Sequence, residues 1–402
     1  MSPERKARIS PTVIVLGFVS LLTDMSTESV YPLIPLFLKN VLKAHVPDIG
    51  IIEGIAESTA SITRVFAGWL SDKLQGRKWI TVAGYSLSAL SKPLLYFATV
   101  WPQVLGIRFA DRLGKGIRSA PRDALIADVS DPANRGIAFG FHNAMDTIGA
   151  ILGPLLAFLV IRSLAASGSD IAESLYRRMF LLTAIPAAIG ILILVLFVRE
   201  HRHTADGTQM PPVKLSGLGK DFVRFLIVTV VFSLGNSSDV FLVLKAQRVG
   251  ISTVNILLVY ALFNTVEATF STWAGAVSDR IGRKNVILVG YVIFAFVYAG
   301  FGLAANWLTV VLLFAAYGLY NAVTQGAQKA FAADLTESNV RGTGMGTYQT
   351  LSGLALFPAS VIAGYLWTVN PSATFYYGAA TAIIAALMLA VLFRSRTTYS
   401  GM

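Results

Sequence analysis

The chain has 402 residues, of which 54% are hydrophobic and only 14% are charged, and it contains no cysteine. Soluble proteins are about 25% charged, so these few charges cannot cover the surface of a water-soluble globule of this length. The lack of cysteine excludes a disulfide scaffold, a thiolate metal site and thiol redox chemistry. The net charge of +11 would suit a nucleic-acid partner, but the positions of the basic residues indicate another explanation.

Apolar stretches long enough to cross a bilayer recur along the whole chain. A membrane span needs about 20 apolar residues, and lipid leaves backbone polar groups no partner outside a helix or a closed barrel. The period-2 alternation of a barrel strand is absent, so we expect an all-α integral membrane protein. The twelve predicted spans are 12–38, 49–71, 80–99, 103–125, 137–162, 179–198, 222–245, 253–274, 286–305, 307–330, 344–368 and 374–394.

Basic residues concentrate in the segments that follow every second predicted span. Twelve spans place both chain ends on one side of the membrane, and the loops on that side are richer in Lys and Arg than the opposite loops. This asymmetry predicts that both termini are cytoplasmic, in a multi-pass protein of the cell (inner) membrane. The positive charge is then a consequence of topology. The expected partners are the lipid bilayer and a small-molecule substrate, with no nucleic acid, and the expected functional unit is a monomer.

Residues 76–140 recur 206 positions later without a gap. The matches include the motif Gly76-Arg77-Lys78, repeated at 282–284, and Ala127-Asp128, repeated at 333–334. An offset near half the length indicates two six-helix bundles, and because both begin on the cytoplasmic side they are parallel repeats. The predicted domains are residues 1–198 and 222–402, joined by a charged, proline-containing cytoplasmic linker at 199–221.

A loop motif stands at the predicted cytoplasmic ends of the second and eighth spans. It reads G-x-x-x-D-R-x-G-R-K at 275–284, and the copy at 68–78 has one extra residue. An aspartate at one helix end can pair with basic groups and with the positive N-terminus of the next helix. We expect a conformational latch, with fixation of topology as the alternative; its residues are Asp72, Arg77, Asp279 and Arg283.

With these motifs the sequence resembles the major facilitator superfamily over essentially its full length. The resemblance implies that superfamily's fold of two six-helix bundles and transport by alternating access. Arg112-x-x-x-Gly116 is similar to a fourth-span motif that the resemblance links to proton transfer. Gly149-x-x-x-Gly153-Pro154 is similar to a motif associated with antiporters, although Ala157-Phe158 replaces its Gly-Gly pair. Close helix packing through small residues explains this partial motif equally well.

The fourth predicted span carries seven charges on one side. At about 100° per residue these charges fall within an arc of about 140°, and apolar residues cover the opposite side. Such a helix needs a polar interior on one side only. The central-cavity charge stripe consists of Arg108, Asp111, Lys115, Arg118 and Arg122, together with Arg112 and Asp123.

The other spans of the first half supply partners, so that seven acids meet seven bases. Fourteen unpaired charges at mid-bilayer would cost roughly 35–49 kcal/mol, which exceeds the roughly 5–15 kcal/mol by which native proteins are stable. The groups must therefore be paired or face a water-filled cavity. Burial and neighbouring bases shift carboxylate pKa values in opposite directions, towards a range useful for proton exchange.

Two neighbouring carboxylates of the first span, Asp24 and Glu28, are our candidates for proton coupling. They lie one helical turn apart on one face, and we expect Arg112 to modulate them. Glu57 and Asp146 are reserve candidates. The alternative is that this charge network only fixes the packing of the helices.

The second half lacks the charge stripe. At the same offset, the six stripe positions from Arg108 to Arg122 become Phe314, Tyr317, Gly318, Asn321, Thr324 and Gln328. This asymmetry suggests that the first half couples to ions and the second provides more of the neutral substrate surface. The substrate-binding candidates there are Asn236, Asp239 and Glu267.

No phosphate-binding loop, nucleophile elbow or zinc-binding helix occurs in the sequence. We therefore expect no catalytic residues, no metal and no cofactor, and an ion gradient, namely of protons, as the energy source. The predicted function is secondary active transport of a small organic solute, with export by antiport slightly favoured. The alternatives are a proton-coupled uptake symporter for a small organic solute, organic anions included, a non-transporting membrane receptor or scaffold, and a polytopic membrane enzyme.

Overall fold

The computed structural model describes residues 9–74, 76–131, 134–164, 171–199, 218–337 and 340–394, without the side chain of Asp72. All regular structure in these ranges is helical, and no strand occurs in them. Nine helical segments within them are long and apolar enough to cross a membrane. The chain is thus an integral, multi-pass membrane protein, as the composition predicts.

Every predicted span coincides with a helical segment. The segments outside the apolar set are α3 (Val46–Leu74), α4 (Lys78–Leu94) and α5 (Trp101–Asp128). Helix α4 has only 17 residues, and α5 carries the charge stripe. The count of twelve spans and the cytoplasmic position of the termini remain predictions.

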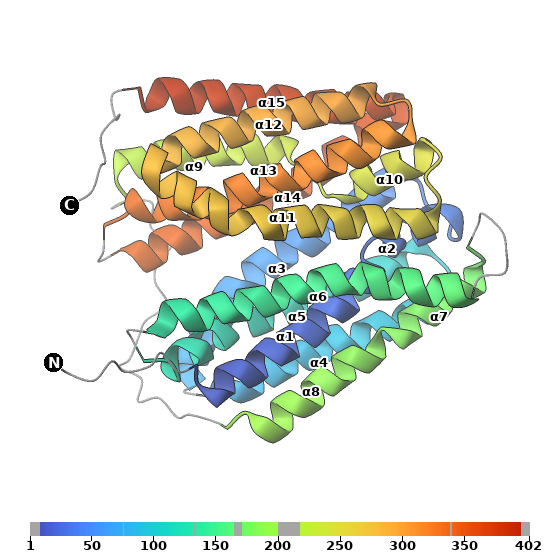
Figure 1. The fold of residues 1–402 in the computed structure, drawn as a ribbon, viewed down its shortest axis with the longest axis horizontal. Coiled ribbons are helices and arrows are strands. Elements are labelled where there is room, and N and C mark those ends of the chain that lie inside the picture. Colours follow the sequence, from blue (N-terminus) through green and yellow to red (C-terminus); the bar gives the residue numbers. More distant parts are fainter. Residues whose placement is uncertain are drawn as a thin grey trace. The chain divides into compact units, whose positions relative to one another are not determined.

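The helices form two compact units. The first unit contains residues 62–165, with the end of α3, and also α1 (Pro11–Val30) and the helices between 172 and 210. Here α1 packs on α6 and α8, while α4 packs on α5 and α8 (Figure 1). The remaining elements of this unit are the short helix η1 (Leu95–Phe97), α6 (Arg135–Leu164), α7 (Glu173–Leu182) and α8 (Ala184–Phe197).

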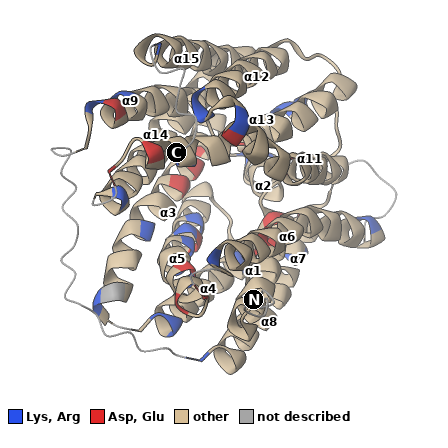
Figure 2. Cartoon of the chain, turned by 60° about the vertical axis from the view of Figure 1, so that its left-hand side comes forward, with Lys and Arg blue, Asp and Glu red and all other residues tan. Residues whose placement is uncertain are grey.

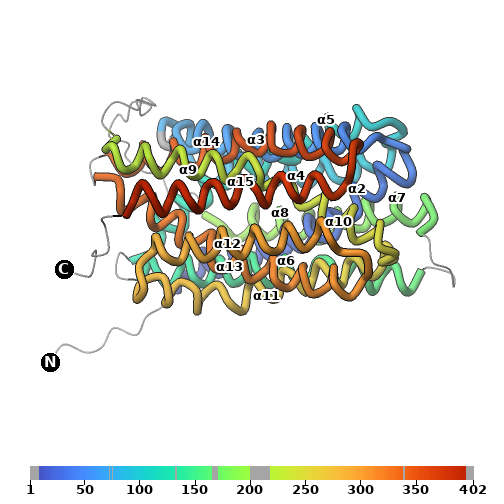
Figure 3. Tube along the Cα trace, turned by 90° about the horizontal axis from the view of Figure 1, so that it is seen from above, coloured from blue at the N-terminus to red at the C-terminus, as the bar shows by residue number. Residues whose placement is uncertain are grey.

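The second unit contains α2 (Leu33–Asn40), residues 46–61 of α3 and all helices after residue 218. Helix α13 packs on α11 and α12, and α15 packs on α9, α12 and α14. Figure 3 shows α9 and α15 side by side. The C-terminal helices are α9 (Lys220–Gly235), α10 (Val240–Arg248), α11 (Thr253–Ile281), α12 (Arg283–Leu303), α13 (Trp307–Asp334), α14 (Arg341–Val369) and α15 (Pro371–Leu392).

The packing pattern of the first unit recurs in the second. The contacts α1–α6, α1–α8, α4–α5 and α4–α8 correspond to α9–α14, α9–α15, α12–α13 and α12–α15. Two breaks also correspond, because Tyr31 lies between α1 and α2, and Ser237, 206 positions later, lies between α9 and α10. The helix packing therefore follows the internal repeat of the sequence.

The two compact units differ from the predicted domains, 1–198 and 222–402, in one segment. Residues 32–61 group with the C-terminal helices rather than with the first unit. Within the second unit, Ser58 of α3 donates a hydrogen bond to the carbonyl oxygen of Gly353 in α14 at 2.9 Å. Residues 200–217 of the predicted linker lie outside the described residues, so the predicted domain limits stay a prediction.

Two glycines allow α1 and α6 to pack closely. A Cβ atom at Gly149 would lie 2.5 Å from the carbonyl oxygen of Leu21, and one at Gly153 would lie 2.7 Å from that of Met25. The Ser29 hydroxyl also donates to the Gly153 carbonyl at 2.8 Å. Helix packing is therefore a sufficient physical reason for the Gly-x-x-x-Gly spacing.

Substituting alanine for Gly149 or Gly153 should destabilise the first unit by about 1–3 kcal/mol, because the added methyl group meets backbone rather than a flexible side chain. Gly140 of the same helix is the matched control, since a Cβ there has no neighbour within 4 Å. Gly140→Ala should be neutral or stabilise the helix by up to about 1 kcal/mol. Thermal unfolding of the three variants in detergent measures the difference, and equal effects at all three positions would contradict this packing.

Candidate functional site

The charged stripe of α5 is largely buried within the first unit. Arg108, Asp111, Arg112 and Arg118 are each at most 4% exposed, and Figure 2 shows basic residues gathered around α5. Apolar residues and small side chains occupy the rest of the helix surface, as the periodicity predicts. The structure thus places the stripe towards protein, where each charge needs a partner.

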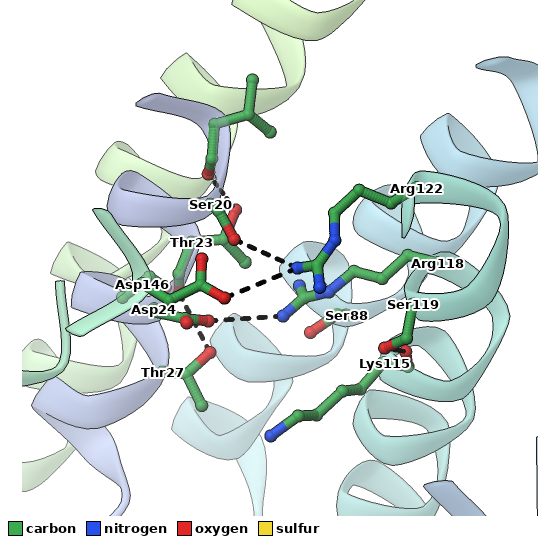
Figure 4. A network of polar contacts seen from close by, with 12 residues as sticks. Ser20, Thr23, Asp24, Thr27, Ser88, Lys115, Arg118, Ser119, Arg122 and Asp146 are labelled. Atoms are coloured by element: carbon green, nitrogen blue, oxygen red, sulfur yellow. Dashed lines mark hydrogen bonds and ion pairs between the residues drawn. The ribbon is translucent and has the colours of Figure 1, made fainter. Parts of the chain in front are cut away.

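Asp24 of α1 faces Arg118 of α5. Its Oδ1 atom accepts a hydrogen bond from Arg118 Nη2 at 3.4 Å, and Figure 4 shows both side chains pointing towards each other. The Asp24 side chain is 24% exposed, whereas that of Arg118 is 3% exposed. The guanidinium also lies 4.4 Å from the ring centroid of Tyr85, as a cation–π contact. The aspartate is thus the member of the pair that solvent can reach.

A second carboxylate, Asp146 of α6, faces Arg122 of α5. Its Oδ2 atom lies 3.8 Å from Arg122 Nη1 and 3.6 Å from Nδ1 of His142, one turn earlier on α6. Arg122 also donates to the Ser20 hydroxyl of α1 at 3.2 Å and to Asp123 at 2.9 Å. Asp24, Asp146, Arg118 and Arg122, contributed by three helices, form what we call the arginine network (Figure 4).

The stripe continues towards the N-terminal end of α5 through Asp111. This carboxylate accepts a hydrogen bond from Ser88 of α4 at 2.5 Å and one from Arg108 at 3.4 Å. Lys92 of α4 is 3% exposed, and its Nζ atom donates to the Ser26 hydroxyl of α1 at 3.2 Å. These contacts join α1, α4 and α5 around a second set of buried charges.

The other predicted coupling residues do not belong to the arginine network. The Arg112 guanidinium is 5.7 Å from the ring centroid of Tyr31. Figure 4 shows Lys115 extending from α5 on the same side as Arg118. Glu28 lies on α1 where α6 approaches, since a Cβ at Gly153 would be 2.9 Å from Glu28 Cβ. Glu57 belongs to the second unit. Their roles in coupling remain predictions.

The substrate candidates lie in the second unit, at and near the break between α9 and α10. Asp239 directly precedes α10 without a side-chain capping hydrogen bond, and it accepts a hydrogen bond from the Tyr317 hydroxyl at 2.8 Å. Glu267 of α11 accepts hydrogen bonds from Asn321 at 3.3 Å and from Gln325 at 3.4 Å. Asn236 ends α9, and its buried Oδ1 atom has no hydrogen-bond partner among the described residues.

The two loop motifs form equivalent contacts. Arg77 forms a salt bridge with Asp128 at the end of α5, and Arg283 forms one with Asp334 at the end of α13. The following lysines also correspond, since Lys78 donates to the Val195 carbonyl at 2.9 Å and Lys284 to that of Phe393 at 2.7 Å. Each motif therefore connects three helices of its unit.

The predicted aspartates of the latch have smaller parts in these contacts. Asp279 lies 3.8 Å from Arg283, farther than Asp334 does. The side chain of Asp72 lies outside the described residues. Sequence reasoning did not assign Asp128 and Asp334 to the latch, although their recurrence at the repeat offset was a signal for both.

Asp128→Asn should destabilise the protein by about 2–4 kcal/mol, because it removes the negative charge from a salt bridge whose two side chains are largely buried. Asp334→Asn should cost only about 0–1 kcal/mol, as for an exposed ion pair, since Asp334 is 53% exposed and Arg283 keeps both Asp279 and the Ala330 carbonyl. Thermal unfolding midpoints of the two variants, each compared with the wild-type protein, measure this difference in stability. A larger loss for Asp334→Asn would show that burial does not set the strength of these bridges.

The sequence profile of the Major Facilitator Superfamily matches residues 16–266 and again residues 225–401. The chain belongs to this superfamily. It is 37% identical over 394 residues to an uncharacterised MFS-type transporter of Methanocaldococcus jannaschii, with 96% of each chain covered. The family makes the chain a membrane transporter, not an enzyme, and transporters of this family bind small-molecule substrates in the membrane.

The names of more distant relatives refer to different compounds. The quinolone resistance protein NorA of Staphylococcus aureus is 23% identical over 394 residues, covering 90% of this chain and 92% of the relative. The crystal structure of a mutant of the nucleoside transporter NupG has a TM-score of 0.78 at 15% identity, covering 95% of this chain and 100% of the other. A D-xylose–proton symporter has a TM-score of 0.76 at 17% identity, with 94% and 96% covered. At such identities the solved structures support the fold alone.

Proposed function

We propose that the protein is a secondary active transporter that moves a small organic solute by alternating access and couples this movement to protons. The observation that carries the proposal is the unequal exposure of the Asp24–Arg118 pair. A carboxylate that solvent reaches is held at 3.4 Å by an arginine that is 3% exposed. A proton from water can neutralise the carboxylate and weaken its attraction to the arginine.

A proton on Asp24 would loosen α1 from α5, and a proton on Asp146 would loosen α6 from α5, because both arginines belong to α5. Proton binding would therefore favour one arrangement of the helices over another, which is the requirement for coupling. Without a phosphate-binding loop in the sequence, an ion gradient is the proposed source of energy. The protein would work as a monomer in the cell (inner) membrane, without a cofactor or nucleic acid.

Export in exchange for protons is the direction we propose. The partial antiporter motif at Gly149 to Pro154 supports it, as does the similarity to a quinolone resistance protein. The alternative, uptake together with a proton, is favoured by the resemblance in fold to a D-xylose–proton symporter. The two directions predict opposite responses to the same pH gradient.

Flux measurements in proteoliposomes test the proposal. The solute is first selected by thermal stabilisation of the purified protein across a chemically diverse library, because binding raises stability by mass action. An imposed pH gradient should then drive its accumulation, on the acidic side for antiport and on the alkaline side for symport. Flux that is indifferent to the gradient would contradict proton coupling.

A further inference from the structure

The polar face of α13 differs in kind from that of its counterpart α5. Its residues Tyr317, Asn321 and Gln325 are spaced four apart and so lie on one face. At the repeat offset they stand where α5 has Asp111, Lys115 and Ser119. In α13 this face has only neutral donors, and both carboxylates described next contact it.

Asp239 and Glu267 approach this face at different heights. Tyr317 donates to Asp239 at 2.8 Å, and Asn321 and Gln325 donate to Glu267 at 3.3 and 3.4 Å. The donors span eight residues, or about 12 Å along the helix. Neither carboxylate belongs to a salt bridge within the described part of the chain, and both are partly accessible. The arrangement therefore surrounds two carboxyl groups with neutral hydrogen-bond donors.

The other charged residues of the second unit do not make the surroundings of Asp239 and Glu267 positive. Glu53 and Glu57 of α3 lie within electrostatic range of Asp239 and add negative charge. Lys329 is in electrostatic range of Glu267, but it is exposed one turn beyond Gln325. Lys245 lies near the far end of α10. The region around the two carboxylates is negative.

A further unsatisfied group lies three residues before Asp239. Asn236 Oδ1 is buried and accepts no hydrogen bond from the described residues, and a buried polar atom without a partner is costly. The Oδ1 atom of Asn236 and the two carboxyl groups all supply hydrogen-bond acceptors. The break that contains it recurs between α1 and α2, and interrupted helices at corresponding positions of two repeats are characteristic of transporter binding sites.

Aromatic rings form an apolar wall next to Asp239. Tyr317 lies 5.4 Å from both Phe263 and Tyr320, and 6.2 Å from Tyr298, between ring centroids. All four rings are at most 4% exposed. Such a wall lowers the local dielectric constant and strengthens the attraction of a carboxylate for a cation. It suits the apolar skeleton of an organic molecule better than a hydrated metal ion.

We infer that Asp239, Glu267 and Asn236 form a subsite for the protonated amino group of an organic amine. An ammonium group supplies the positive charge that the carboxylates lack and the N–H donor that Asn236 lacks. The inference rests on the proposed function, because it names the substrate class of the same transporter. It does not depend on whether protons drive the movement.

The test is thermal unfolding of the detergent-purified full chain at pH 7 with pairs of probes that share a carbon skeleton. Tryptamine is paired with tryptophol, and benzylamine and hexylamine are paired with their alcohols. At least one amine should raise the unfolding midpoint by about 2–5 °C at saturation, while its alcohol should not. If no amine stabilises the protein, or if each alcohol matches its amine, the inference is wrong.

Substitutions then locate the subsite. Asp239→Asn and Glu267→Gln should each weaken binding of the stabilising amine about tenfold or more. The matched control is Asp221→Asn, which removes a partly exposed carboxylate of α9 that pairs with Arg224 and should leave the affinity unchanged. Tyr317→Phe should keep or strengthen amine binding, since it removes a competing neutral donor. Loss of binding in Tyr317→Phe and in the control alike would indicate a general structural effect and overturn the inference.

Failure of this inference can be separated from failure of the proposed function. If amines bind through Asp239 but their flux does not respond to the pH gradient, the subsite is supported and proton coupling is contradicted. If a neutral or anionic solute is transported in response to the gradient and no amine binds, coupling stands and the subsite falls.

Discussion

We expect Asp24→Asn to remove most of the accumulation driven by a pH gradient and to leave solute exchange partly intact. The amide keeps an acceptor for Arg118, whose Nη2 atom lies 3.4 Å from Asp24 Oδ1, but it cannot take up a proton. The solute can then still be exchanged across the membrane while the gradient no longer drives it. The expected loss of accumulation is about 5–150-fold, the usual range of a coupling free energy.

Counterflow and gradient-driven uptake in the same proteoliposomes measure this difference. The control is Glu173→Gln on α7, because Glu173 forms an exposed salt bridge with Arg177 away from the arginine network, and both activities should persist in it. Glu28→Gln tests the second predicted carboxylate in the same way. Unchanged accumulation in both the Asp24 and Glu28 variants would remove the first span from the coupling mechanism.

Asp24→Leu should be less stable than the double variant Asp24→Leu/Arg118→Met. The single change leaves a guanidinium that is 3% exposed without its counter-charge, at a cost of about 3–5 kcal/mol. Arg118→Met costs less, because the remaining carboxylate is accessible and can bind a proton. Removing both charges should therefore restore part of the stability that Asp24→Leu loses.

A double-mutant cycle measured by thermal or denaturant unfolding isolates this coupling. The pair Asp221 and Arg224, at 3.1 Å, provides a matched cycle, because its carboxylate is as exposed as Asp24 (24%) but its arginine is 51% exposed. Its coupling should be about 0–1 kcal/mol. Additive effects for Asp24 and Arg118 would mean that the pair does not interact in the folded protein.

The helical fold and its internal repeat were predictable because they follow from composition and spacing. Bilayer spans need long apolar runs, and each predicted run coincides with a helical segment. The interruptions were harder to predict, because Tyr31 and Asn236 stand within runs whose overall hydropathy remains that of one span. The grouping of residues 32–61 with the C-terminal helices depends on contacts between distant segments, such as Ser58 with Gly353.

The candidate site shows the same division between local and distant information. The charge stripe of α5 could be predicted because its residues lie on one helix and recur with the helical period. The pairing of each acid with its base could not be predicted in the same way, because partners such as Asp24 and Arg118 are separated by 94 positions. Neutral partners such as Ser20 and Tyr85 carry no signal of their own, because serine and tyrosine occur along the whole chain. The equivalent bridges to Asp128 and Asp334 could have been found from the repeat alone.

The most direct test of the central claim is the proton movement that accompanies solute flux. Proteoliposomes containing a pH-sensitive dye are supplied with the solute that most stabilises the protein, without an imposed gradient. The account predicts a change of internal pH with the wild-type protein and none with Asp24→Asn, although that variant still binds the solute. Equal proton movement with both proteins, or none with either while solute crosses the membrane, would contradict it.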